Sequence, residues 1–327
     1  MLIDLGTVKI DPPVLLAPMA GITDMPFRSM VARFGAGLMV SEMVATQEML
    51  HAHPGVRARA ELGEHAQSTS IQIAGRDAFW MGEAAKLIEC SGARLIDINM
   101  GCPAKKVTSG YSGSALMRTP DFALELVEAV VNATNLPVTL KMRLGWDDES
   151  MNAPYIASRA ADLGIRMITV HGRTRCQFYK GVANWSAIRA VKQAVNVPVI
   201  ANGDIIDATT ARQALQQSGA DGVMIGRGAQ GQPWKIAQVA QALHGGETIR
   251  VPQGRDLIDL IHKHYNLALE FYGAEIGVRV FRKHIGWYLN AQGIAHPACK
   301  PIMTEKNPMK VKQQIADILL NKVANAA

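Results

Sequence analysis

The sequence predicts an α/β protein: a (β/α)8 TIM barrel over residues 1–245, followed by an all-helical domain over residues 246–327. Short apolar runs recur eight times before residue 226, and most of them follow a helical stretch. Short strands that alternate with helices pair in parallel through crossover helices, and eight such units fit a closed barrel. The strand signal stops after Gly245-Gly246, and residues 255–327 read as helices only.

Most of the expected strands begin at or near a glycine or a proline. In chain order they occupy residues 13–16, 37–40, 70–73, 92–96, 135–138, 164–168, 196–199 and 219–225. Helical patterns between the later strands cover residues 121–133, 152–163, 184–195 and 207–217. A doubly wound open sheet is the alternative. We favour the barrel because the strand count reaches eight and no G-x-G-x-x-G motif follows the first strand.

The composition is that of a globular enzyme, with 48% hydrophobic and 19% charged residues. There is no apolar run of about 18 residues, so we expect no membrane span. The N-terminus lacks a secretory pattern, and we expect a cytoplasmic protein. Four cysteines without C-x-x-C spacing argue against a zinc site or disulfides, so we expect free thiols and no metal. The net charge of +6 is compatible with a polyanionic partner but does not require one.

Polar residues and glycines follow nearly every expected strand. The carboxyl ends of the strands carry the chemistry in barrels of this kind, whereas the opposite face contributes stability. Here they lead into Ala17–Gly21, Glu42, Gln72, Asn99, Lys141 with Arg143, His171 with Arg173, Asn202-Gly203-Asp204 and Gly226-Arg227. A ring of such groups at one mouth predicts a binding site.

Two parts of this ring indicate a phosphate and a heterocycle. The turns at Gly203 and Gly226 follow the last two strands, where barrels commonly bind phosphate through backbone N–H groups, and Arg227 adds a charged donor. Lys141, with Gln72 and Asn99 at the same level, can hydrogen-bond a flavin and stabilise negative charge on it. The alternative for Lys141 is a structural salt bridge with Asp97 or Glu42.

Cys102 lies in an unusual place for a packing cysteine. Cysteine is usually a buried, inert hydrophobe, but this one follows the apolar run 95–98 and stands between Gly101 and Pro103. Glycine and proline are turn residues. The thiol is therefore a candidate for chemistry at the mouth of the barrel.

Five motifs together resemble the bacterial tRNA-dihydrouridine synthase family, most closely its B subfamily. They are Ala17-Pro18-Met19-Ala20-Gly21-Ile22-Thr23-Asp24, Ile98-Asn99-Met100-Gly101-Cys102-Pro103, Lys141-Met142-Arg143, His171-Gly172-Arg173-Thr174 and Asn202-Gly203-Asp204-Ile205. The resemblance implies an FMN-binding barrel and a helical tRNA-binding domain that together reduce uridine to 5,6-dihydrouridine with NADPH as reductant. The B subfamily implies a D-loop uridine at tRNA position 17.

The resemblance also implies roles for individual residues. FMN contacts would be Pro18, Met19, Ala20, Gln72, Lys141, His171, Asn202, Gly203, Asp204, Gly226 and Arg227. Cys102 would be the catalytic acid, giving a proton to C5 of the uracil while flavin N5 supplies a hydride to C6. An ordinary thiol is mostly protonated at neutral pH, and we expect Cys102 to stay so until the hydride arrives. The Gly- and Ser-containing loop 104–114 is expected to close over the substrate as a lid.

Basic residues are expected to hold the RNA while the target base is extruded into the barrel. Lys105, Lys106, Arg143, Arg173 and Arg175 are expected on loops at the mouth, and Arg282 and Lys283 belong to a basic cluster in the C-terminal helices. Asn99 would read an edge of the uracil. We expect the protein to act as a monomer.

Two other functions remain open from the sequence. A flavin-dependent dihydroorotate or dihydropyrimidine dehydrogenase would use a similar barrel on a free pyrimidine, but it would need neither the helical domain nor the basic loop. A non-catalytic RNA-binding barrel protein would have no use for Cys102 together with Lys141.

Overall fold

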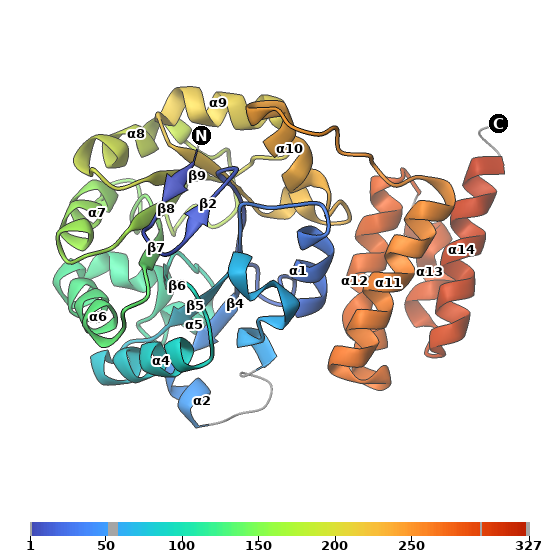
Figure 1. The fold of residues 1–327 in the computed structure, drawn as a ribbon, viewed down its shortest axis with the longest axis horizontal. Helices are drawn as coiled ribbons and strands as arrows, with labels where there is room; N and C mark the ends of the chain where they lie inside the picture. The colour runs from blue at the N-terminus through green and yellow to red at the C-terminus, as the bar shows by residue number, and fades with distance from the viewer. Residues whose placement is uncertain (1, 52–57, 295, 325–327) are drawn as a thin grey trace.

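Eight parallel strands close into a barrel in the computed structural model, which describes residues 2–51, 58–294 and 296–324 (Figure 1). The strands are β3 (Val14–Leu16), β4 (Leu38–Ala45), β5 (Thr69–Ala74), β6 (Ile96–Met100), β7 (Val138–Arg143), β8 (Met167–His171), β9 (Val199–Asn202) and β10 (Gly222–Ile225). The last strand pairs with the first, with Val223 opposite Val14. This closure confirms the predicted barrel and excludes an open sheet.

Helices cover the outside of the barrel. They are α1 (Met25–Ala32), α2 (Thr46–Leu50), α4 (Ala78–Cys90), α6 (Pro120–Ala133), α7 (Ala153–Asp162), α8 (Trp185–Ala194), α9 (Ala208–Ser218) and α10 (Lys235–His244), whereas the short α5 (Lys105–Thr108) lies in the loop after β6 at the mouth. The four helices predicted between the later strands are found to within one residue at each end. Local capping explains this agreement for α9: Asp207 accepts from the Thr210 backbone N–H, and Gly219 ends the helix in the left-handed region at φ +69°.

A short antiparallel hairpin at the N-terminus was not predicted. It consists of β1 (Ile3–Asp4) and β2 (Lys9–Ile10), which are too short to give a periodic signal. Its apolar side chains join the inward-facing residues of the strands in one buried cluster: Ile3, Leu5, Val8, Ile10, Leu15, Ala17, Leu38, Val40, Leu95, Met167, Ile200 and Met224. This cluster fills the end of the barrel at which the strands begin. Any cavity is therefore confined to the end at which the strands finish.

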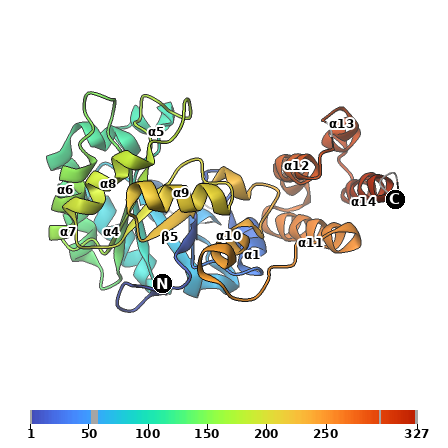
Figure 2. The same cartoon turned by 90° about the horizontal axis from the view of Figure 1, so that it is seen from above.

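Four further helices form a bundle beside the barrel, next to α1 (Figures 1 and 2). They are α11 (Gly254–Tyr272), α12 (Ala274–Ala291), α13 (His296–Thr304) and α14 (Pro308–Ala324). The bundle shares its apolar core with Met30 and Trp234 of the barrel part. The boundary expected after residue 245 falls in the link between α10 and α11; that the two parts are separate domains stays a prediction. Among the helices in the described ranges, none has the length and apolar character needed to cross a membrane.

A part-buried hydrogen bond links the bundle to the barrel. Asp24 caps α1 by accepting from the Phe27 N–H at 3.0 Å, and its other oxygen accepts from the Tyr272 hydroxyl of α11 at 2.8 Å. Burial raises the pKa of Asp24 to about 6, against the lowering effect of these two hydrogen bonds. Because the folded-state pKa exceeds the unfolded one, the stability that Asp24 contributes at low pH is lost as the pH rises through about 6.

We therefore expect Asp24→Asn to stabilise the protein at pH 8. Asparagine keeps a cap acceptor and a partner for Tyr272 but has no charge to desolvate, so the gain is expected to be about 1–3 kcal/mol. Urea unfolding at two pH values measures it, and the gain should nearly vanish at about pH 4, where Asp24 is protonated. Tyr272→Phe is the control, since it removes a hydrogen bond without removing a charge. A gain that is equal at both pH values would contradict the assignment.

Candidate functional site

A cavity of about 600 Å³ opens at the carboxyl ends of the strands, within the size range of cofactor sites. Every residue that the sequence assigned to FMN lines it, as do Asn99, Cys102 and Arg143. The alternation of the strands explains this convergence: neighbouring strands pair Asn99 with Lys141 and His171 with Asn202, and these side chains share the inner face. The residues are thus brought together, and their roles remain a prediction.

Lys141 places a buried ammonium in the wall of this cavity. Its Nζ donates to Asn202 Oδ1 at 3.1 Å. Burial lowers the pKa of Lys141 to about 8, although the Asp97 carboxylate acts to raise it. Within the described part of the chain no carboxylate oxygen lies within 4 Å of this ammonium, so the alternative of a direct salt bridge with Asp97 or Glu42 is wrong. The ammonium therefore keeps donors for a ligand.

His171 lies beside Lys141 as a neutral ring. Burial, together with the cations of Lys141, Arg143 and Arg173, holds its pKa well below the ordinary value. Its Nε2 is 3.3 Å from Nη1 of Arg173. A guanidinium only donates, so Nε2 accepts and Nδ1 carries the proton. Gly203 leaves space for this ring, since a Cβ there would come within 2.8 Å of His171 Cδ2, and its φ of +115° also favours glycine.

The ends of β9 and β10 form the part of the cavity that suits an anion. No acceptor among the described residues is found for the backbone N–H groups of Gly226, Arg227 and Gly228. A side chain at position 228 would meet Ile205 O at 2.8 Å, so glycine is required there. The Arg227 side chain is 56% exposed and lies 3.5 Å from Asp204. Three free N–H groups and a cation match the chemistry of a phosphate.

Arg143 and Arg173, which the sequence placed on loops at the mouth as RNA contacts, are both buried. Arg143 is the last residue of β7 and points inward; it donates to Gly101 O at 2.8 Å, and also to Thr174 O and Phe178 O. Arg173 binds both oxygens of Asp204 and donates to backbone carbonyls of the following loop. Most of their donors are engaged within the protein because the loop 174–181 folds over them; within the described residues no hydrogen bond is found for Nη2 of Arg143, which lines the first cavity. A contact of either residue with RNA stays a prediction.

Cys102 is held on a tight turn at the rim of the cavity. Asn99 Oδ1 accepts from the N–H groups of Gly101 at 3.1 Å and Cys102 at 2.9 Å. The Cys102 carbonyl accepts from the Ser114 hydroxyl at 2.8 Å and from the Ser114 N–H at 3.1 Å. The thiol is partly exposed. In this structure the expected lid starts as the helical turn α5 and is anchored at Ser114; its closure stays a prediction.

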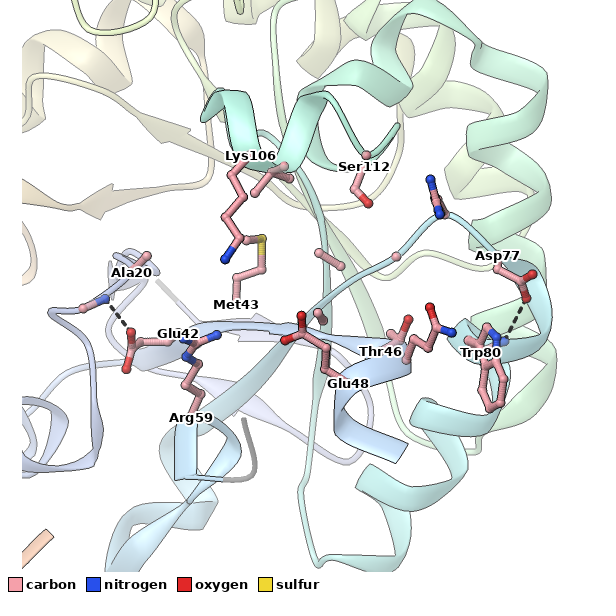
Figure 3. Close-up of a pocket in the computed structure, with 18 of the residues that line it drawn as sticks. Ala20, Glu42, Met43, Thr46, Glu48, Arg59, Asp77, Trp80, Lys106 and Ser112 are labelled. Atoms are coloured by element: carbon pink, nitrogen blue, oxygen red, sulfur yellow. Dashed lines mark hydrogen bonds between the residues drawn. The ribbon is translucent and has the colours of Figure 1, made fainter. Parts of the chain in front are cut away.

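A second cavity of about 870 Å³ lies between the barrel and the helical bundle, and Figure 3 shows the side of it that the barrel forms. It shares Ala20 and Met43 with the first cavity, so the two adjoin. Its walls come from β4 and α2, the turn between β5 and α4, the α5 loop, and the helices α11 and α12. Figure 3 shows Lys106 reaching down from the α5 loop, with Arg59, Glu42 and Glu48 on the facing side.

Two of the basic residues predicted to bind RNA, Lys106 and Lys283, line this second cavity. Lys105 and Lys106 are exposed on α5, and Lys106 lines the cavity. Lys283 also lines it and donates to the Gly21 carbonyl, while its neighbour Arg282 is half-buried. Arg175 stacks on Trp146, with its guanidinium carbon 4.6 Å from the ring centroid.

Arg59 and Arg76 also line the second cavity and were missed from the sequence. Arg59 follows no barrel strand and stands in no basic run, so only the tertiary structure reveals it, whereas Arg76 lies two residues after the end of β5 and its strand position could have indicated it. No group of three or more His, Cys, Asp or Glu side chains that suits a metal ion occurs in the described residues.

Comparison with known proteins identifies the family. A protein-family model described as "Dihydrouridine synthase (Dus)" matches residues 15–325. The chain belongs to the dihydrouridine synthase family. This family member is 60% identical over 309 residues to a "Probable tRNA-dihydrouridine synthase" of Rhodobacter capsulatus, with 94% of this chain and 95% of the relative covered. It is 47% identical over 287 residues to "tRNA-dihydrouridine synthase B" of Xanthomonas axonopodis pv. citri, with 87% and 86% covered.

These relatives confirm that the chain is an enzyme of the predicted family. Solved structures agree on the fold of this dihydrouridine synthase family member. Histamine dehydrogenase from Rhizobium sp. 4-9 superposes with a TM-score of 0.57 at 13% identity, covering 81% of this chain and 50% of that chain. A morphinone reductase mutant in complex with tetrahydroNAD gives 0.53 at 16% identity, covering 78% and 93%. At such identities the likeness concerns the fold alone.

Proposed function

We propose that this enzyme is an FMN-dependent tRNA-dihydrouridine synthase that reduces a D-loop uridine, at tRNA position 17, with NADPH as reductant. We further propose that it acts as a monomer. The observation that carries the proposal is the placement of Cys102 at the rim of a cavity whose donors suit a flavin phosphate and ring. The similarity to relatives named tRNA-dihydrouridine synthase B supports the subfamily, and the position is what the resemblance to that subfamily implies.

The residues of the first cavity fit FMN at both ends. Lys141 and Gln72 would bind the pyrimidine end of the isoalloxazine, where an ammonium stabilises negative charge. Gly226, Arg227 and Gly228 would bind the phosphate through their backbone N–H groups. Pro18, Met19 and Ala20 would lie along the flat ring. When bound, FMN supplies the hydride that C6 of the uracil receives.

Cys102 supplies the proton that completes the reduction. The C5–C6 double bond gains one hydride and one proton, so an acid must face C5 on the side opposite the hydride donor. The Asn99 and Ser114 hydrogen bonds fix the backbone on both sides of the Cys102 Cα. His171, held neutral, can donate through Nδ1 to an oxygen of the base without adding a charge.

The second cavity gives the RNA a route to the site. An extruded uridine in the first cavity leaves its neighbouring nucleotides outside, next to Ala20 and Met43. Lys106 and Arg59 stand on facing sides of that space, and Lys283 borders it from α12. These cations would neutralise RNA phosphates.

Replacing Lys106 by glutamine is expected to weaken tRNA binding and its salt dependence. Each lost phosphate contact should lower the slope of log K against log salt by about one. A filter-binding titration at several salt concentrations measures this slope. Lys86→Gln is the matched control, because Lys86 pairs with Glu83 on the outer surface of α4. Equal slopes for both variants would contradict a role of Lys106 in RNA binding.

Mapping dihydrouridine in tRNA tests the proposed function as a whole. Deleting the gene should remove dihydrouridine at position 17, and adding purified protein with FMN and NADPH should restore it. An unchanged map, or restoration at another position only, would contradict the proposed specificity. Turnover of free uracil or dihydroorotate without tRNA would instead favour a small-molecule dehydrogenase, and a purified protein that binds no flavin would favour a non-catalytic RNA-binding barrel.

A further inference from the structure

A continuous line of hydrogen bonds runs from the middle of the barrel to the Cys102 turn. The Gln72 amide donates from Nε2 to Asp97 Oδ2 at 2.7 Å. Gln72 Oε1 accepts from Asn99 Nδ2, also at 2.7 Å. Asn99 Oδ1 in turn accepts from the backbone N–H groups of Gly101 and Cys102. Three side chains on two strands therefore connect a buried carboxylate to the proposed acid.

The strand register creates this line. Gln72 on β5 lies opposite Asp97 on β6, and Asn99 stands two residues farther along β6, so it faces the same side of the sheet. The side chains are enclosed: Gln72 is 0% exposed, Asp97 3% and Asn99 7%. An unpaired donor or acceptor in these surroundings cannot form a hydrogen bond to water instead. The orientation of each amide is therefore strongly constrained.

The chemistry of the two ends sets the direction of every bond between them. Asp97 accepts through both oxygens, one from Gln72 and the other from the Thr139 hydroxyl at 2.7 Å. At the other end, the backbone N–H groups of the Cys102 turn can only donate. An amide presents an acceptor on one side and a donor on the other. With an acceptor at one end of the line and donors at the other, Gln72 and Asn99 can each satisfy all partners in one orientation only.

We propose that Asp97 is a positioning residue for the proton transfer: through Gln72 it orients the Asn99 amide so that the Asn99 oxygen holds the Cys102 turn. This inference rests on the proposed role of Cys102 as proton donor. Asp97 itself touches neither the turn nor the substrate cavity, whose lining includes Gln72, Asn99 and Cys102 but not Asp97.

The substitution Asp97→Leu tests the direction of the line. Leucine offers no acceptor to the Gln72 N–H₂ group, so this buried donor is left unpaired and the Gln72 amide no longer has a fixed direction toward Asn99. We expect the Cys102 turn to loosen and uridine reduction by the pre-reduced holoenzyme to fall about tenfold. Reduction of the bound flavin by NADPH should change less than about threefold, because the turn takes no part in it.

The isosteric substitution Asp97→Asn is the matched variant that preserves the line. Its amide oxygen still accepts from Gln72, and its N–H₂ group donates to the Thr139 hydroxyl, whose own proton turns to the Ile96 carbonyl 3.3 Å away. This variant should therefore hold the turn like the parent, although it has lost the same charge as Asp97→Leu. Thr139→Val is a second control, because it leaves the Asp97 oxygen that faces Gln72 in place.

The geometry of the turn is read out by alkylation of Cys102 with iodoacetamide, followed peptide by peptide with mass spectrometry in the full-length protein. We expect alkylation about tenfold faster in Asp97→Leu, and near the parent rate in Asp97→Asn and in Thr139→Val. Both substitutions of Asp97 remove a carboxylate that supports the Lys141 cation, an effect that appears in FMN affinity rather than in Cys102 alkylation.

Two results would overturn the inference: an unchanged alkylation rate in Asp97→Leu, or a rate in Asp97→Asn as fast as that in Asp97→Leu. Failure of the proposed function would look different. The parent enzyme itself would then leave tRNA uridine unreduced, whereas the alkylation series would still show whether Asp97 orients the turn.

Discussion

The Cys102→Ala variant is expected to bind FMN and to be reduced by NADPH like the parent, yet to reduce tRNA uridine about 10²- to 10⁴-fold more slowly. The thiol is the proposed source of the C5 proton, whereas the groups that suit FMN lie on other strands and loops. Anaerobic stopped-flow absorbance separates the two half-reactions: NADPH bleaches the flavin in the first, and tRNA restores its colour in the second.

Cys90→Ala provides the control for this experiment. Cys90 is an exposed thiol at the end of α4, outside both cavities. Its removal should leave both half-reactions unchanged. If Cys102→Ala reoxidised with tRNA at the parent rate, the proton would have to come from another group, and the proposed acid would be wrong.

The second large effect is expected for Lys141→Met, through the affinity for FMN. A charge-assisted hydrogen bond to a buried ammonium contributes about 1.5–3 kcal/mol, so its loss should weaken binding about tenfold to hundredfold. Since the pKa of Lys141 is lowered to about 8, the ammonium is present below that pH and is lost above it. The parent should therefore bind FMN progressively more weakly as the pH rises through about 8.

Fluorescence titration of the FMN-free protein between about pH 6.5 and pH 9.5 measures this dependence. The Lys141→Met variant should bind weakly and with little change over that range, because the titrating group is gone. Lys86→Met, on the outer surface, should follow the parent curve. A parent affinity that stays constant across the range would show that the Lys141 ammonium does not bind the cofactor.

The barrel could be predicted from the sequence because its strands are buried on both sides and therefore appear as repeated apolar runs. The residues of the first cavity followed from the same signal, since a parallel barrel brings all strand ends to one mouth. Gln72, Lys141 and Asn202 are far apart in the chain, yet strand position alone was enough to group them.

What the sequence did not provide depends on side-chain direction and on long-range packing. Arginine is usually an exposed residue, so nothing in the sequence indicates that Arg143 and Arg173 are buried. Arg143 belongs to the inner face of β7, and the loop 174–181 covers both side chains. The role of Asn99 in holding the Cys102 turn requires knowing which side of its amide faces the loop. Arg59 and Arg76 border a cavity whose far wall is more than two hundred residues away in the chain.

The shared apolar core between bundle and barrel limits how this chain can be divided. Met30 and Trp234 are 0% and 2% exposed, and Phe34 packs against the same cluster. A barrel without residues 246–327 would expose these three side chains to water as one apolar patch, which favours self-association. The C-terminal helices thus cover an apolar surface of the barrel that would otherwise cause aggregation. They also form one wall of the larger cavity.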